Sequence, residues 1–206
     1  MIAVIDYGMG NLRSVQKAVQ RAGGQDVRLV TTAAELTPAD KIIFPGVAAF
    51  GDAMAQLRQQ GLVDPIRQMV ARGVPYLGFC LGLQLLFEVG YEDGEHEGLG
   101  ILGGKVVRFD FGPEFASQRL RVPHMGWNQI DFTSDSPMLK GIASGTYVYF
   151  AHSYYPVPSQ DIAVTTTQYG IRFTSSVHKD NVFATQFHPE KSQAAGLRLL
   201  QNFVEL

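Results

Sequence analysis

Residues 74–87 read VPYLGFCLGLQLLF, and this stretch decides the fold. Its first six residues form a short apolar run containing Val, Tyr and Phe, which favours a β-strand. Its last five residues, 83–87, favour a helix. Glycines at positions 78 and 82 flank Cys80, as expected where a chain turns too tightly to leave room for Cβ atoms. The stretch therefore predicts a buried strand that turns sharply into a helix, with Cys80 at the turn.

The sequence before this stretch alternates short apolar runs with segments of helical spacing. Asn11 is placed to cap the first helix, and the glycines at 23 and 24 are placed to end it. Short connections containing glycine separate these segments, which predicts parallel strands covered by helices. Strands are expected at residues 2–6, 26–30, 41–44 and 74–79, and helices at residues 12–22, 52–60 and 65–71.

The second half of the chain has a different pattern, with several strand-like runs close together. Turn signals at residues 169–170 and 179–181 predict hairpins between the last three runs, and Ser192 is placed to cap a final helix. The fold class is therefore α/β, with a mostly parallel central sheet, flanking helices and antiparallel strands that extend it. Without a repeat or linker, residues 1–206 are expected to form a single domain. The runs cover residues 105–109, 146–150, 162–168, 172–177 and 182–187.

Charge and composition exclude several classes of protein. Seventeen Lys and Arg against nineteen Asp and Glu leave no basic excess to neutralise nucleic-acid phosphates. The single cysteine cannot form an internal disulfide. The first residues lack the basic region of a signal peptide, and no apolar run approaches the ~20 residues of a membrane span. We expect a cytoplasmic chain with no nucleic-acid partner and no membrane partner.

Cys80 is the first candidate for chemistry. A thiol at the start of a helix meets unpaired backbone N–H groups, which favour the thiolate. The N–H of Leu81 lies beside the sulfur, where it can stabilise negative charge on a carbonyl oxygen under attack. The alternative is an inert buried thiol, since free cysteine is among the most buried residue types. The flanking glycines at a strand–helix junction favour the reactive interpretation.

The HPEKS motif at residues 188–192 supplies a candidate base. Proline pushes the preceding His188 into an extended conformation, in which residues two apart point to the same side. The carboxylate of Glu190 can then hold one ring nitrogen of His188 and leave the other free to act on a nucleophile. The alternative is a loop histidine beside a solvated acid, but a candidate thiol elsewhere in the chain favours the paired interpretation.

The loop that leaves the expected strand at 41–44 contains a second candidate backbone donor. Loops at the carboxyl ends of neighbouring parallel strands meet in one crevice, so the N–H of Val47 or of its neighbour can face a carbonyl attacked by Cys80. An ordinary strand-to-helix turn is the alternative. One cysteine and scattered histidines give no metal-ligand spacing, so no metal site is expected.

These stretches together resemble the class I, or triad, glutamine amidotransferases over nearly the whole chain. The motifs that carry this resemblance are PGV at 45–47, GFCLGLQ at 78–84 and HPEKS at 188–192. Further motifs are similar to the glutaminase subunits of imidazole glycerol phosphate synthases, which act in histidine biosynthesis. These are DYGMGNL at 6–12, GLGIL at 98–102, VPHMGWN at 122–128 and HSYY at 152–155.

The resemblance implies an enzyme and assigns roles to residues. Cys80 would attack the side-chain amide of L-glutamine, forming a γ-glutamyl thioester and releasing ammonia. His188 would transfer the protons, Glu190 would orient His188, and the N–H groups of Val47 and Leu81 would form the oxyanion hole. The residues expected to hold the substrate are Gly46, Ala48, Gln84, Ser153 and Tyr154.

The resemblance also implies a partner and excludes a cofactor. Members of this family need neither cofactor nor metal. Ammonia would pass to a (β/α)₈-barrel synthase subunit in a heterodimer, and Trp127 and Tyr149 are expected on the barrel-facing surface. The alternatives are a glutaminase subunit of another ammonia-channelling synthase and a catalytically silent module that only binds a partner.

The chain departs from the family at position 48, where Ala replaces the glycine of the usual PGVG loop. A positive φ is more costly for alanine than for glycine. We therefore expect the loop to balance its inactive and oxyanion-binding shapes differently.

Overall fold

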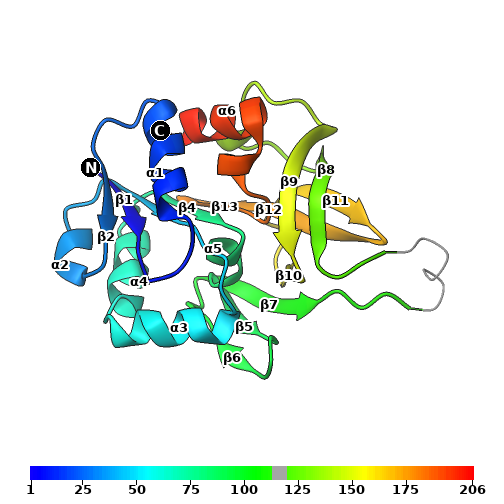
Figure 1. Cartoon of the computed structure of the whole chain (residues 1–206), viewed down its shortest axis with the longest axis horizontal. Coiled ribbons are helices and arrows are strands. Elements are labelled where there is room, and N and C mark those ends of the chain that lie inside the picture. The colour runs from blue at the N-terminus through cyan, green and yellow to red at the C-terminus, as the bar shows by residue number, and fades with distance from the viewer. Residues whose placement is uncertain (113–119) are drawn as a thin grey trace.

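The computed structural model describes residues 1–112 and 120–206, which form two β-sheets with helices packed around the larger one (Figure 1). Among these residues, no helix is long and apolar enough to cross a membrane. The larger sheet contains β1 (Ile2–Ile5), β2 (Val27–Val30), β3 (Lys41–Phe44), β4 (Tyr76–Phe79), β8 (His124–Phe132), β9 (Thr146–His152), β11 (Ala163–Tyr169), β12 (Ile171–Lys179) and β13 (Val182–Thr185). The smaller sheet contains β5 (Phe87–Gly90), β6 (His96–Glu97), β7 (Leu102–Arg108) and β10 (Tyr154–Pro158).

The strand order of the larger sheet is β2-β1-β3-β4-β13-β12-β11-β8-β9. Strands β2, β1, β3, β4 and β13 run parallel to one another, and each further strand pairs antiparallel to its neighbour. The expected α/β fold is confirmed, with a parallel part and an antiparallel extension. The expected hairpin turns are also confirmed, since they join β11 to β12 and β12 to β13.

Helices cover both faces of the parallel part (Figure 1). The helices are α1 (Leu12–Arg21), α2 (Ala33–Leu36), α3 (Phe50–Gln59), α4 (Val63–Ala71), α5 (Leu81–Gln84) and α6 (Gln193–Val204), with 3₁₀ turns η2 (Pro137–Leu139) and η3 (Pro189–Lys191). Helices α1 and α6 pack on one face, and α3 and α4 pack on the other.

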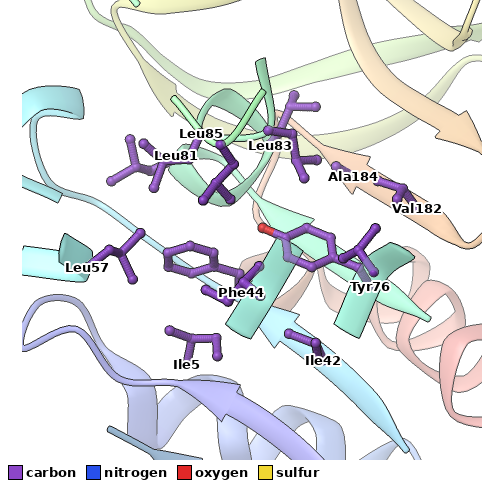
Figure 2. Packing of buried hydrophobic residues seen from close by; sticks show 14 of the residues in the cluster. Ile5, Ile42, Phe44, Leu57, Tyr76, Leu81, Leu83, Leu85, Val182 and Ala184 are labelled. Carbon is purple, nitrogen blue, oxygen red and sulfur yellow. The ribbon is translucent and has the colours of Figure 1, made fainter. Parts of the chain in front are cut away.

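The two cores follow from the alternation of side chains along each strand. In β3, Ile42 and Phe44 enter the core beneath α3 and α4, whereas Ile43 enters the core beneath α1 and α6. Figure 2 shows Phe44 between Leu57 of α3 and the ring of Tyr76 in β4. Both faces of β3 and β4 are buried, so these two strands hold the loops at their carboxyl ends on a rigid base.

The two expected helix caps had different outcomes. Asn11 caps α1 as predicted, because its side-chain oxygen accepts a hydrogen bond from the Ser14 N–H at 3.4 Å. Ser192 occupies the N-cap position of α6 as predicted, but its side chain makes no capping hydrogen bond to that helix. Its hydroxyl instead donates to the carbonyl of His188 at 2.7 Å and accepts from the N–H of Tyr149 at 3.0 Å. Ser192 therefore fixes the backbone at His188.

The helix expected over residues 83–87 is wrong beyond position 84. Helix α5 ends there, and Phe87 begins β5. The carbonyls of Leu85 and Leu86 accept hydrogen bonds from the N–H groups of Leu99 and Ile101. Long-range pairing with a distant segment thus replaces the helical bonds that the local sequence favours.

Candidate active site

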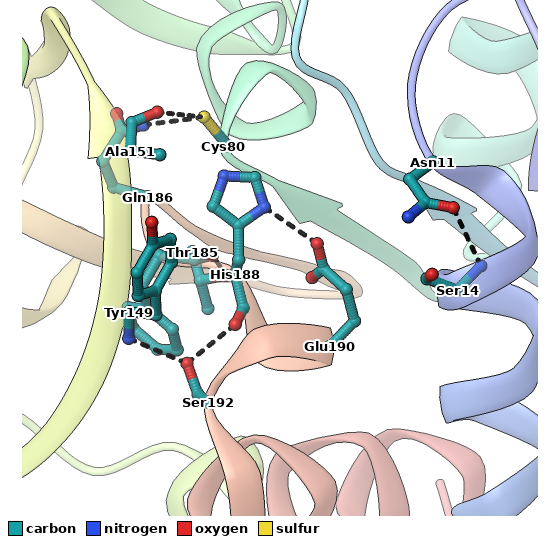
Figure 3. A network of polar contacts seen from close by, with 11 residues as sticks. Asn11, Ser14, Cys80, Tyr149, Ala151, Thr185, Gln186, His188, Glu190 and Ser192 are labelled. Atoms are coloured by element: carbon teal, nitrogen blue, oxygen red, sulfur yellow. Dashed lines mark hydrogen bonds and ion pairs between the residues drawn. The ribbon is translucent and has the colours of Figure 1, made fainter. Parts of the chain in front are cut away.

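Three neighbouring parallel strands bring the candidate residues together. Strands β3, β4 and β13 are adjacent and point the same way, so the segments that follow them emerge at one edge of the sheet. The segment after β3 is the loop at 45–49, the segment after β4 begins with Cys80, and the segment after β13 contains His188. Figure 3 shows the side chains of Cys80, His188 and Glu190 gathered at this edge.

Cys80 occupies a strained turn between β4 and α5. Its φ is 50° and its ψ is −103°, a conformation that L-residues rarely adopt. The turn requires the flanking glycines, because a Cβ on Gly78 would lie 2.4 Å from the carbonyl oxygen of Gly82. A Cβ on Gly82 would lie 1.8 Å from the carbonyl oxygen of Phe44. This close packing holds the Cys80 side chain at the edge of the sheet.

Gly82→Ala is expected to destabilise the protein by about 3 kcal/mol or more, since a rigid backbone carbonyl occupies the position of the new methyl group. The measurement is the midpoint of urea unfolding. Gly103→Ala is the matched control, because the nearest atom there is the rotatable Ser159 hydroxyl oxygen. Equal midpoints for the two variants would contradict this account of the turn.

His188 lies beside Cys80 and is held from two sides. Its Nδ1 is 2.9 Å from Oε1 of Glu190, and its backbone N–H donates to the carbonyl of Tyr149 at 2.9 Å. The His188 side chain is 2% exposed, and its Nε2 has no hydrogen-bond partner among the described residues. Figure 3 shows the sulfur of Cys80 near the ring edge opposite the bond to Glu190. The free nitrogen is therefore available to the thiol.

The charges around His188 favour its protonated form. Burial by itself lowers the pKa of this imidazole, but the Cys80 sulfur and the Glu190 carboxylate oppose that effect and raise the pKa to about 10. The Cys80 sulfur and the Glu190 carboxylate thus both favour the protonated form of His188.

The loop at 45–49 does not present a formed oxyanion hole. The N–H of Leu81, one of the two expected donors, donates to the carbonyl of Gly46 at 3.5 Å. The Val47 side chain is 56% exposed, and the buried hydroxyl of Tyr7 lies beneath Gly46. Ala48 does not have a positive φ, so this shape of the loop imposes no penalty on alanine.

A cavity of about 330 Å³ opens beside Cys80. This volume lies at the lower end of the range for small-molecule sites. Five of the residues singled out from the sequence do not line the cavity: Gly46, Trp127, Tyr149, His188 and Glu190. Its lining includes seven of the residues singled out from the sequence: Val47, Ala48, Cys80, Leu81, Gln84, Ser153 and Tyr154.

Two polar side chains set the character of the cavity. The amide nitrogen of Gln84 donates to the carbonyl of Tyr154 at 2.9 Å, so its Oε1 is the atom left to accept from a ligand. The carboxylate of Glu92 also lines the cavity and accepts from the Phe50 N–H at 2.7 Å. Burial raises the pKa of Glu92 above its ordinary value. The site therefore combines an acid with an amide oxygen.

Two residues near the sulfur and the cavity, Gln186 and Glu92, were not predicted from the sequence. Glu92 lies in a polar stretch, residues 91–97, which reads as a solvated loop. Gln186 is fully buried, and its amide nitrogen donates to the Cys80 sulfur at 3.5 Å. The sequence feature that could have identified Gln186 is its position as a lone amide near the end of the apolar run at 182–187.

Trp127 and Tyr149 lie on a different part of the surface, the outer edge of the larger sheet. They are direct cross-strand partners in β8 and β9, with ring centroids 6.1 Å apart. Trp127, Met125 and Tyr147 are exposed, Tyr149 is half-buried, and Met125 lines the cavity as well. We call these four residues the aromatic patch. Over the described ranges, no cluster of three or more His, Cys, Asp or Glu side chains could hold a metal ion.

Known proteins match this chain over nearly its whole length. The family model for the class I glutamine amidotransferases matches residues 3–206. The HisH subunit of imidazole glycerol phosphate synthase from Syntrophotalea carbinolica is 51% identical over 207 residues, covering all of both chains. The HisH subunit from Moorella thermoacetica is 52% identical and covers all of this chain and 94% of its own.

Solved structures of lower sequence identity share the fold. A crystal structure of a glutamine amidotransferase superimposes with a TM-score of 0.76 at 20% identity, covering 100% of this chain and 98% of its own. The structure of PurLQS from Thermotoga maritima gives a TM-score of 0.75 at 18% identity, covering 99% of this chain and 97% of its own.

The chain belongs to the class I glutamine amidotransferases. Within this class it belongs with the HisH subunits of imidazole glycerol phosphate synthase, as the similarity across its whole length shows.

Proposed function

We propose that this chain is the glutaminase subunit of an imidazole glycerol phosphate synthase, acting in histidine biosynthesis in the cytoplasm as a single domain spanning residues 1–206. It would hydrolyse L-glutamine to glutamate and deliver the ammonia to a (β/α)₈-barrel synthase subunit. The observation that carries the proposal is the alignment of Cys80, His188 and Glu190 beside a cavity, in a chain about half identical to HisH subunits.

The proposed reaction uses Cys80 as nucleophile and His188 as proton carrier. The thiol proton moves to Nε2 of His188, and the sulfur attacks the side-chain carbonyl carbon of glutamine. His188 then protonates the departing nitrogen, the C–N bond breaks, and ammonia leaves a γ-glutamyl thioester. A water molecule loses a proton to His188 and attacks the thioester, the C–S bond breaks, His188 returns the proton to the sulfur, and glutamate leaves after losing its carboxyl proton to solvent. Glu190 holds Nδ1–H throughout, so Nε2 keeps facing the sulfur.

Stabilisation of the tetrahedral intermediate requires a different shape of the loop at 45–49. The proposed oxyanion donors are the N–H groups of Val47 and Leu81, but the Leu81 N–H is bonded to the Gly46 carbonyl. Rotation of the peptide after Gly46 would remove that carbonyl and turn the Val47 N–H toward the site. Two such donors are worth a few kcal/mol of barrier height. The described loop shape therefore corresponds to a weakly active state.

The cavity provides contacts for the amino-acid end of glutamine. We assign the α-ammonium group to Glu92 and to Oε1 of Gln84, since both are acceptors lining the cavity. Ser153, Tyr154 and the backbone of Ala48, which line the cavity, are proposed to hold the remainder of the amino-acid backbone, joined by the backbone of Gly46 when the loop changes shape. The reaction itself calls for no cofactor and no metal.

The aromatic patch is the proposed contact surface for the barrel subunit. Trp127 is 45% exposed, Tyr147 is 56% exposed and Met125 is 64% exposed. Aromatic and Met side chains are enriched in protein interfaces. Because Met125 also lines the cavity, a partner seated on the patch would lie close to the point where ammonia is released.

The test is glutamine turnover with and without the partner. The chain alone is expected to hydrolyse glutamine weakly, because its Leu81 N–H is occupied, and a co-purified barrel subunit with its ligand bound is expected to activate it. Ammonia production would be measured at saturating glutamine in both states. Strong hydrolysis by the single chain, unchanged by the partner, would contradict the proposal. A silent binding module would show no turnover in either state and no selective alkylation of Cys80.

A further inference from the structure

A buried amide contacts the candidate nucleophile on the side away from His188. Gln186 is 0% exposed and lies between β13 and η3. Its Nε2 is 3.5 Å from the sulfur of Cys80, and its Oε1 is 3.1 Å from Nε2 of Gln84. Figure 3 shows Gln186 and the carbonyl of Ala151 meeting the sulfur from the same side.

The direction of these bonds is fixed by one backbone atom, the carbonyl oxygen of Tyr154. A carbonyl only accepts, so the Gln84 atom 2.9 Å from it must be the NH₂ group. The same NH₂ group lies against Gln186, whose nearer atom must therefore be its oxygen. The nitrogen of Gln186 is then the atom that faces Cys80. The orientation of this amide follows from its surroundings and not from an arbitrary choice of flip.

The same carbonyl orders a second branch of hydrogen bonds. Nδ1 of His152 lies 2.8 Å from the Tyr154 oxygen and must carry a proton, so Nε2 of His152 accepts from Nδ1 of His124 at 3.0 Å. Nε2 of His124 in turn accepts from the Asn128 amide at 3.3 Å. Burial lowers the pKa of His124 to about 4 and that of His152 to about 3, so both rings are neutral. This neutral branch fixes Tyr154 without adding charge near the sulfur.

We propose that Gln186 is a further catalytic residue, whose side-chain N–H donates to the Cys80 sulfur and stabilises it as a thiolate. This inference rests on the proposed function for its consequence in catalysis, but not for its effect on the thiol. Hydrogen bonds to charged acceptors are stronger than bonds to neutral ones, so the bond from Gln186 strengthens when the proton leaves.

The Ala151 carbonyl acts in the opposite sense on the same atom. It lies 3.7 Å from the sulfur and can accept only from the protonated thiol. Each contact therefore stabilises a different protonation state of Cys80. The Ala151 carbonyl favours the thiol, and the Gln186 amide favours the thiolate. If the Gln186 amide were removed, the Ala151 carbonyl would remain and would favour the protonated thiol.

The test uses the fact that the chain contains a single cysteine, so alkylation by iodoacetamide reports on Cys80 alone. In Gln186→Met, which keeps the length but removes the donor, the pH of half-maximal alkylation is expected to rise by about one unit. In Gln186→Glu the rise is expected to be larger, because a carboxylate beside the sulfur repels a thiolate. Both are measured on the full chain, with circular dichroism to confirm folding.

The matched control is Thr167→Val, which also removes a fully buried polar group. The Thr167 hydroxyl has no hydrogen-bond partner among the described residues and does not line the cavity. Its alkylation profile is expected to match that of the unaltered chain. If Gln186→Met does not fold, the isosteric Gln186→Glu decides the question with the same measurement.

The kinetic readout separates this role from a structural one. In the complex with the barrel subunit, Gln186→Met is expected to lower kcat for glutamine about 10-fold, with KM within about threefold of its original value. An unchanged alkylation profile in both Gln186 variants would overturn the proposal even if activity fell. If the profile shifts but no form of the complex hydrolyses glutamine, the thiol interaction stands and the proposed function fails.

Discussion

Cys80→Ala is expected to lower glutamine hydrolysis by the complex at least about 10⁴-fold, the largest effect of any single substitution considered. The reason is that no other described residue lining the cavity can replace Cys80 as the nucleophile. None of them has a thiol, and the Ser153 hydroxyl is a proposed substrate contact. The measurement is kcat for glutamate production at saturating glutamine.

The control for Cys80→Ala is synthesis from added ammonia by the same complex. This activity is expected to persist, because ammonia enters the reaction after the step that needs the thiol. Formation of the complex would be checked by gel filtration. Substantial glutamine hydrolysis by the variant would rule out Cys80 as the nucleophile, and loss of the ammonia-supported reaction would indicate that the substitution had damaged the partner interface.

The parallel half of the fold could be predicted because its signals are local. Asn11 marks the start of α1 as a helix-capping residue. The alternation of strand-like and helix-like segments predicts that β1 to β4 lie in one sheet. The expectation failed at residues 85–87, where bonding to residues 98–102 decides the structure. It was incomplete at β8, whose first residues at 124–128 mix aromatic and polar side chains. Pairing with β9 and β11, both distant in sequence, makes this stretch a strand.

The candidate site divides in the same way. Cys80 and the pairing of His188 with Glu190 could be predicted because a short motif carries each, and parallel strands bring their loops together. The state of the oxyanion loop could not, since it depends on the orientation of one peptide after Gly46. The contact from Gln186 to the sulfur spans 106 positions, and no local pattern encodes it. Local motifs thus identify the candidate residues, and tertiary packing determines the contacts that these residues make.

Glu190→Gln is the second substitution with a large expected effect, a fall in kcat of about 10²- to 10⁴-fold. If the glutamine oxygen faces Nδ1 of His188, the ring keeps its orientation but loses the negative charge that stabilises its protonated form. If the glutamine NH₂ group faces Nδ1 instead, the proton of a neutral ring moves to Nε2, where it can no longer accept from the thiol. The second arrangement gives the larger loss.

The same substitution has a consequence for stability that depends on pH. The Cys80 sulfur and the Glu190 carboxylate together raise the pKa of His188 in the folded chain to about 10, above its value of about 6.5 in the unfolded chain, and Glu190→Gln removes the contribution of the carboxylate. This difference stabilises the fold fully below pH ~6.5 and is lost as the pH rises through ~10. The gap in urea stability between the original chain and Glu190→Gln is therefore expected to be wide near pH 6 and narrower near pH 10. A gap that widens with pH, or a kcat within threefold of the original, would show that Glu190 does not act on His188 in this way.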